Sequence, residues 1–267
     1  MAEPVAEMAI SSELRLRVLS SAVLAPVALL VVWLGGLFLL IALLLVTGLL
    51  AREWVGLVTT PGGVSLVALL AAAGLVAAHF GIVQWALVGL VVSGLGLALV
   101  APGSISARGL AGLGPLYIGG ACIAFLMLRA VPESGVVLIV WLLAVISATD
   151  IGAYFAGRSI GGRKLAPAIS PGKTWAGLYG GMIAAAAVGT AIATVSAILP
   201  PLAASVGAAV LAVVAQLGDL FESWLKRRAG VRDSGDLIPG HGGLLDRVDG
   251  VMTTVPVMAI AFLTVMG

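Results

Sequence analysis

The sequence predicts an all-α, polytopic integral membrane protein with about nine transmembrane helices, and three observations lead to this fold class. Of the 267 residues, 61% are hydrophobic and 10% are charged, whereas a globular domain carries about 25% charged residues. The mean hydropathy is +1.20. Apolar segments of roughly 20 residues, the length that crosses a bilayer, follow one another along nearly the whole chain.

Short junctions rich in glycine and proline, which interrupt helices, separate the expected spans. Gly35-Gly36 joins the first two spans so tightly that we expect them to form a hairpin, and Pro200-Pro201 stands between the seventh and the eighth. The expected spans are 18–34, 36–56, 64–80, 82–101, 109–128, 135–156, 174–197, 202–225 and 249–266.

The positions of the Lys and Arg residues predict the orientation of the chain. With the N-terminus in the cytoplasm, 13 of the 14 bases fall on the inner side and Arg129 falls outside, as the positive-inside rule requires. Acidic residues stand where a signal peptide would carry bases, so we expect the first span to remain as an anchor. The predicted topology is N-in, C-out, with N-terminal transmembrane helices in 1–135 and a C-terminal region in 136–267 whose polar loops, 157–173 and 226–248, face the cytoplasm.

Composition also argues against several classes of protein. The net charge is only +2 and the bases lie in short loops between apolar segments, so no face suits a nucleic-acid duplex. Cys122 is the single cysteine, which leaves no disulfide framework and no thiolate metal site.

Carboxylates gather at the facing ends of the last two expected spans. Asp219, Glu222, Ser223 and Lys226 have the spacing of one helix face. Acids within an apolar span are functional by default, and oxygen ligands at this density suit Mg²⁺. The alternative is that these acids pair with neighbouring bases in a solvated network. The predicted metal ligands are Asp219, Asp246, Asp249 and Asp150, with Glu222 as a weaker candidate.

Phosphate groups have two predicted sites of contact. The run 239–243, Pro-Gly-His-Gly-Gly, offers backbone N–H groups that an anion can approach closely. Lys173 lies at an expected helix start, where the dipole favours anions. For Arg158 and Arg163, an equally good interpretation is that they orient the chain and meet anionic lipid head groups.

Together these residues supply ligands for a hard cation and cations for phosphates, without an evident protein nucleophile. That inventory fits phosphoryl or nucleotidyl transfer, in which positioning and charge neutralisation supply most of the rate. An ion-coupled transporter is the competing reading, because acids in spans also mark ion paths. The clustering of the polar residues at one depth disfavours it.

Three runs of this charged region, residues 223–227 (SWLKR), 232–235 (RDSG) and 237–249 (LIPGHGGLLDRVD), resemble the signature of phosphatidate cytidylyltransferases, the CDP-diacylglycerol synthases. A second block, residues 150–175, is similar to another segment of that family, and the resemblance covers roughly 140–267. The sequence departs from the family pattern at Ile151, Ala176 and Arg232, and the last of these keeps the usual charge.

The resemblance implies that CTP and phosphatidic acid give CDP-diacylglycerol and pyrophosphate, with Mg²⁺ required and a second monovalent or divalent cation left open. It implies an enzyme of the membrane (the inner membrane, if the source is bacterial) whose active site faces the cytoplasm. A CTP-dependent lipid kinase or another lipid nucleotidyltransferase is the alternative, and a homodimer is left open. The expected catalytic residues are Asp246, Lys226, Arg227 and Lys173, and the expected substrate contacts are Ser223, His241, Arg247, Lys164, Gly242 and Gly243.

Overall fold

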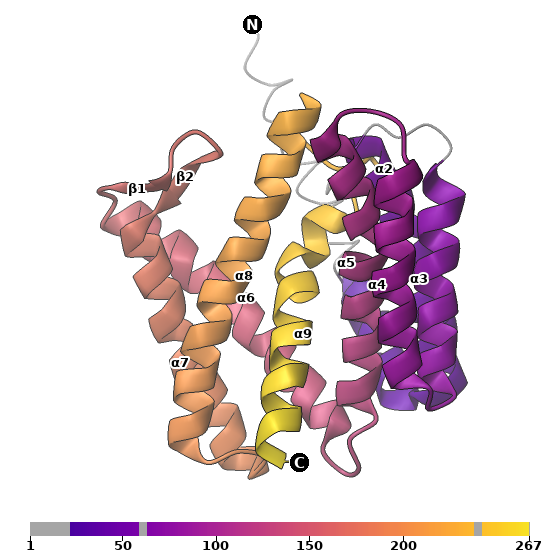
Figure 1. Ribbon diagram of the computed structural model, residues 1–267. Helices are drawn as coiled ribbons and strands as arrows, with labels where there is room; N and C mark the ends of the chain where they lie inside the picture. The colour runs from indigo at the N-terminus through magenta and orange to yellow at the C-terminus, as the bar shows by residue number, and fades with distance from the viewer. Residues whose placement is uncertain (1–21, 59–62, 238–241, 267) are drawn as a thin grey trace, which may run out of the picture.

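The computed structural model describes residues 22–58, 63–237 and 242–266, which form a helical bundle with one short hairpin (Figure 1). The first helix, Ala22–Leu34, is apolar and short. It is followed by α2 (Gly36–Val58), α3 (Gly63–His79), α4 (Val83–Val100), α5 (Ile105–Arg129), α6 (Gly135–Ser159), β1 (Lys164–Ala166), β2 (Ser170–Thr174), α7 (Trp175–Ser196), α8 (Pro201–Ala229) and α9 (Leu245–Met266).

Every apolar segment expected from the sequence overlaps one of these helices. Among the described residues, six helices are long and apolar enough to cross a membrane: α2, α4, α5, α6, α7 and α8. The chain therefore has the architecture of a polytopic membrane protein, while the count of nine spans and their orientation stay predictions.

The expected loop 226–248 is shorter than the sequence indicated. Helix α8 continues to Ala229, so Lys226 and Arg227 lie in its last turn rather than in a loop. Gly230, with a φ of +73°, ends that helix in the left-handed conformation that glycine tolerates best. Because α9 begins at Leu245, the connection between α8 and α9 runs only from 230 to 244.

The segment 157–173, expected as a loop, contains the antiparallel hairpin of β1 and β2. Lys164 pairs with Thr174, and Ala166 pairs with Ser170. Thr174 then caps α7, because its Oγ1 accepts a hydrogen bond of 3.0 Å from the N–H of Gly177. The hairpin thereby places Lys173 directly before the start of α7.

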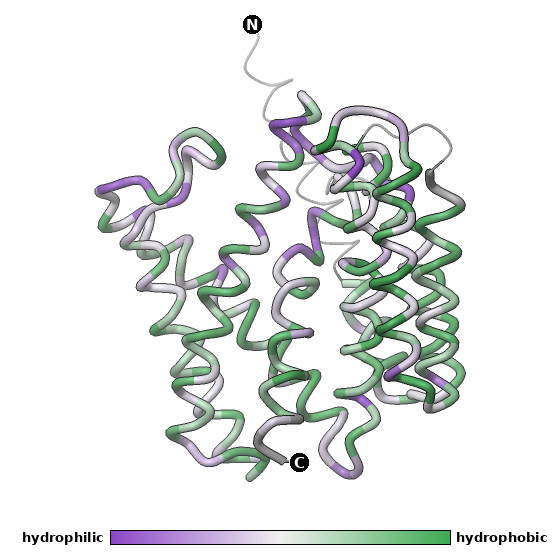
Figure 2. The backbone as a smooth tube through the Cα atoms, viewed as in Figure 1, coloured by the Kyte–Doolittle hydropathy of each residue, from purple (hydrophilic) through white to green (hydrophobic). Residues whose placement is uncertain are grey.

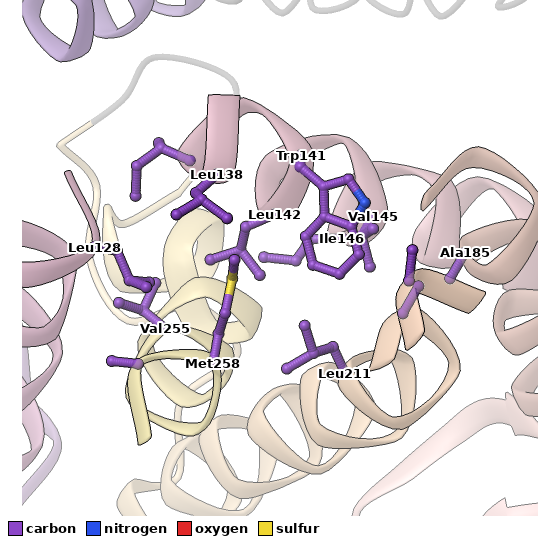
Figure 3. Packing of buried hydrophobic residues seen from close by; sticks show 14 of the residues in the cluster. Leu128, Leu138, Trp141, Leu142, Val145, Ile146, Ala185, Leu211, Val255 and Met258 are labelled. Carbon is purple, nitrogen blue, oxygen red and sulfur yellow. The ribbon is translucent and has the colours of Figure 1, made fainter. Parts of the chain in front are cut away.

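Small residues let α6 and α7 approach closely. A Cβ on Gly180 would overlap the Ala156 side chain, and a Cβ on Gly152 would lie 2.7 Å from the carbonyl oxygen of Gly180. Such contacts replace hydrophobic burial as the source of helix association in lipid. Around them, Trp141, Leu142 and other side chains of α6 pack against α7, α8 and α9 (Figure 3).

A second buried cluster joins the N-terminal helices to α8 and α9. Trp54 of α2 is fully buried and belongs to the same cluster as Leu225 of α8 and Leu245 of α9. The N-terminal helices are thus packed directly against the elements that carry the acids, and α9 lies between α8 and α5 (Figure 1).

The hydrophilic segments gather at one end of the bundle. Figure 2 shows them at the β1–β2 hairpin, the last turns of α8 and the start of α9. Both polar regions predicted to share one side of the membrane therefore lie at the same end of the molecule. At the opposite end, Arg129 donates hydrogen bonds to the carbonyl oxygens of Val32 and Trp33 and so satisfies the last turn of the first helix.

Candidate active site

Lys226 joins the acidic faces of α8 and α9. Its Nζ lies 2.6 Å from Oδ1 of Asp246 and 3.2 Å from Oε1 of Glu222. Glu222 and Lys226 are one turn apart on α8, as their spacing predicted. Both acids are buried, with side chains 1% and 7% exposed, so the ammonium group pairs with carboxyl groups that water scarcely reaches.

The other oxygen of Asp246 organises the connection between α8 and α9. It accepts hydrogen bonds of 2.9 Å from the N–H of Ser234, 3.0 Å from Ser234 Oγ and 2.9 Å from the N–H of Gly243. Burial alone would raise the pKa of Asp246, but polar contacts with Glu222 and Lys226 and the two N–H groups lower it to about 2. This carboxylate is therefore ionised at neutral pH, and both its oxygens have partners.

The two glycines before α9 are needed for this geometry. Gly242 has a φ of +79°, which L side chains rarely adopt. A Cβ on Gly243 would overlap Ser234 Oγ and lie 2.7 Å from Oε2 of Glu53. Their immediate role is thus close backbone packing, and any contact with an anion comes in addition.

Glu53, which the sequence analysis missed, completes this network from the other half of the chain. It is 7% exposed, and its carboxylate accepts hydrogen bonds of 2.7 Å from the N–H groups of both Leu244 and Leu245. Ser234 Oγ lies 2.9 Å from Oε2 of Glu53, and its single proton is donated either to Glu53 or to Asp246. A carboxylate inside an expected span was the signal that could have found it.

A second pair forms where the hairpin meets α8. Lys173 Nζ lies 2.6 Å from Oδ2 of Asp219 and donates a 3.5 Å hydrogen bond to the carbonyl oxygen of Gln216. Ser223 Oγ donates to the other oxygen of Asp219 at 3.2 Å. Lys173 and Ser223 therefore both converge on Asp219 from different elements.

Asp150 and Asp249 lie close enough to Asp219 to repel it electrostatically, and Lys173 offsets part of that repulsion at Asp150. The contact between α8 and α9 is tight beside them, because a Cβ on Gly218 would meet the carbonyl oxygen of Asp249 at 2.8 Å. Three helices, α6, α8 and α9, thus bring one carboxylate each to a common region. Within the described ranges, no three His, Cys, Asp or Glu side chains are already arranged to hold a metal ion.

Three further predicted site residues are exposed. Arg227 is exposed and donates to the carbonyl oxygen of Val231 at 3.4 Å. Lys164 is exposed on β1, and Arg247 is exposed in the first turn of α9. His241 falls outside the described residues.

Comparison with known proteins points to one family. The model of the cytidylyltransferase family matches residues 15–265, so the relation extends through the N-terminal helices and well beyond the motifs of 140–267. The chain is 44% identical over 171 residues to the phosphatidate cytidylyltransferase of Brucella suis. The matched segment covers 64% of this chain and 63% of that relative.

Two further relatives carry the same name as the Brucella protein. The phosphatidate cytidylyltransferase of Bacillus subtilis is 42% identical over 145 residues, 54% of each chain. That of Pseudomonas aeruginosa is 43% identical over 124 residues, 46% of each chain. The matches with these curated relatives span less than two thirds of the relatives' length.

Proposed function

The chain belongs to the cytidylyltransferase family, and on that basis we propose that it transfers the cytidylyl group of CTP to phosphatidic acid. The products are CDP-diacylglycerol and pyrophosphate, as in phospholipid biosynthesis. The relatives whose name states this acceptor, phosphatidate, support the choice of lipid.

The observation that carries the proposal is the pairing of two lysines with carboxylates at one end of an apolar bundle. Lys173 with Asp219, and Lys226 with Asp246, place positive charge for phosphates in the same region as Asp219, which offers oxygen ligands for a cation. A polar substrate from the aqueous phase and a lipid substrate from the membrane are both able to reach such a position.

The chemistry needs no protein nucleophile. A phosphate oxygen of phosphatidic acid attacks the α-phosphorus of CTP, a new P–O bond forms, and the bond to the bridging oxygen of the β-phosphate breaks. Pyrophosphate leaves with the electron pair. We propose that Lys173, Lys226, Arg227 and Arg247 contact the phosphates, where fixed positive charge stabilises the developing negative charge, with Lys164, Ser223, His241, Gly242 and Gly243 as further substrate contacts.

The carboxylates fit Mg²⁺ by their donor chemistry. Asp150, Asp219 and Asp249 offer hard oxygen ligands in one region, and their mutual repulsion is relieved when a cation is bound. Protein sites for Mg²⁺ with nucleotides usually provide one or two carboxylates, and substrate phosphates supply further ligands. When bound, the ion would neutralise phosphate charge.

Asp246 differs from these three. Both its oxygens already accept bonds from Lys226, Ser234 and Gly243. Its Oδ2 is surrounded by three donors and its Oδ1 pairs with the Lys226 ammonium group, so we propose that its main contribution is to hold Lys226 and the connection before α9 in place.

We further propose that this end of the bundle faces the cytoplasm, where CTP is available. The distribution of Lys and Arg supports that orientation, with 13 of 14 on the side predicted to be inner.

The test uses purified protein in detergent with phosphatidic acid, Mg²⁺ and CTP labelled on either the α- or the γ-phosphate, followed by lipid extraction. Cytidylyl transfer places the α-label, and not the γ-label, in the lipid fraction. A γ-label in the lipid would instead identify a lipid kinase. No label in the lipid from folded protein would overturn the proposal.

A further inference from the structure

An apolar cavity of about 580 Å³ lies beside the charged site. It is lined by the first helix and by α2, α5, α6 and α9, and among the described lining residues Arg247 is the one that carries a charge. Its size lies within the range of about 300–1,000 Å³ that is typical of small-molecule sites.

The cavity borders the first turns of α9, the helix that also carries Asp246 and Asp249. Val248, between Asp246 and Asp249 on that helix, contributes to the lining, as does Leu244 immediately before it. Farther along, Val251 and Val255 carry the lining away from the charged end. One end of the cavity thus carries Arg247, the sequence neighbour of Asp246, and the other described lining residues are apolar.

We propose that this cavity holds one acyl chain of an anionic glycerolipid, with the lipid's phosphate monoester at Arg247. The inference rests on the proposed function and deepens it by assigning the position of the lipid substrate. The charge at the polar end and the apolar lining together match the two parts of such a molecule.

The advantage to the reaction is orientation. An acyl chain leaves one apolar medium for another, so its burial in the cavity releases little free energy compared with burial from water. Fixing the chain, however, holds the phosphate at a defined position relative to the second substrate, and such positioning is a large part of catalysis in two-substrate reactions.

Two substitutions on α2 form a matched test. Ala42 lines the cavity, so Ala42→Phe places a ring inside it. Leu45 is 66% exposed and does not belong to the lining residues, so Leu45→Phe adds a similar ring to the outer face of the same helix.

Binding is measured first, without CTP, in phosphatidylcholine vesicles that contain phosphatidic acid with a photoreactive diazirine near the end of one chain. In the wild-type protein we expect crosslinks in residues 39–46 and 121–125, which unlabelled phosphatidic acid suppresses and additional phosphatidylcholine does not. Ala42→Phe should lose these crosslinks and Leu45→Phe should keep them. Arg247→Gln should remove the preference for the anionic competitor.

Turnover is measured second. Ala42→Phe should raise the KM for long-chain phosphatidic acid on the order of tenfold with the KM for CTP unchanged, and a short-chain phosphatidic acid should restore most of the rate. Crosslinks spread over outward residues such as Ile183, or equal labelling of both α2 variants, would show ordinary annular lipid and overturn the inference. Specific crosslinks without any cytidylyl transfer would leave the cavity assignment standing and overturn only the proposed reaction.

Discussion

The carboxylate of Glu53 in α2 accepts a 2.7 Å hydrogen bond from the backbone N–H of Leu245, the first residue of α9. The N–H of Leu244 donates to the other oxygen of the same carboxylate at 2.7 Å. The first N–H groups of a helix lack partners within it, and negative charge there is favourable. An acid from the N-terminal half therefore caps the helix that carries Asp246 and Asp249.

Removing this cap should destabilise the site. Glu53→Ala leaves buried N–H groups without acceptors, and each such group costs about 1–3 kcal/mol. We expect a lower thermal unfolding midpoint in detergent and a large loss of turnover, with Glu53→Gln intermediate because an amide oxygen still accepts. Arg52→Gln, which removes the exposed neighbouring charge, serves as the control. An unfolding midpoint of Glu53→Ala equal to that of the wild type would show that the cap contributes nothing.

The two paired lysines should matter far more than a lysine or arginine that only orients the chain. Removing one preorganised contact to transition-state charge costs about 10²–10³ in rate, so Lys173→Met and Lys226→Met should each lower kcat by that order. Arg158 serves as the comparison, because it is exposed and donates a hydrogen bond to the Tyr154 hydroxyl. Arg158→Ala should lower kcat only slightly. Similar small losses in all three variants would favour a purely topological role for these bases.

The dependence of activity on Mg²⁺ concentration should distinguish carboxylates that bind the ion from those that do not. Asp219→Asn and Asp249→Asn are expected to raise the Mg²⁺ concentration needed for half-maximal activity, because each removes a proposed ligand. Asp246→Asn should instead lower the rate at saturating Mg²⁺, because it weakens the hold on Lys226 and Ser234. A shift in Mg²⁺ requirement for Asp246→Asn as large as that for Asp219→Asn would place Asp246 among the ligands.

The free energy of unfolding should also depend on pH through the ionisation of Asp246. Its folded-state pKa, about 2, lies below the ordinary value of 3.8. A lowered pKa contributes stability that is present above the ordinary value and is lost as the pH falls through the folded value. The difference in unfolding midpoint between the wild type and Asp246→Asn should therefore shrink between about pH 4 and pH 2. A difference that stays constant over that interval would contradict the assigned interactions.

The parts of the structure that the sequence predicted are those encoded locally. The sequence spacing predicted that Glu222 and Lys226, and Asp219 and Ser223, share one helix face, and both pairs are in contact. Residues one turn apart meet on any helix. Hydropathy located the helices because the apolar segments are long. The partners of Glu53 could not be predicted, since they lie more than 180 residues away and depend on how α2 packs against α9. The β1–β2 hairpin was missed because strands of 3 and 5 residues carry too little periodicity to be distinguished from a loop.

Access to the site from one side of the membrane is the remaining prediction. Cys122 is buried, so the wild-type protein should react slowly with an impermeant thiol reagent. Asp236 is exposed in the connection between α8 and α9, and it avoids Ser234, whose hydroxyl bonds Glu53 and Asp246. Phe80 is 74% exposed in the turn between α3 and α4, and that turn lies at the opposite end of the bundle (Figure 1).

If the charged end faces the cytoplasm, Asp236→Cys should react in inverted vesicles and not in right-side-out ones, and Phe80→Cys should show the reverse. CTP with Mg²⁺ should slow the labelling of Asp236→Cys, because the proposed nucleotide site includes Lys226, and it should leave Phe80→Cys unaffected. Reaction of Asp236→Cys only from the outer face would reverse the topology and exclude a cytoplasmic active site. If Asp236→Cys reacts from the inner face at the same rate with and without CTP, the predicted topology stands. The connection between α8 and α9 would then not be part of the nucleotide site.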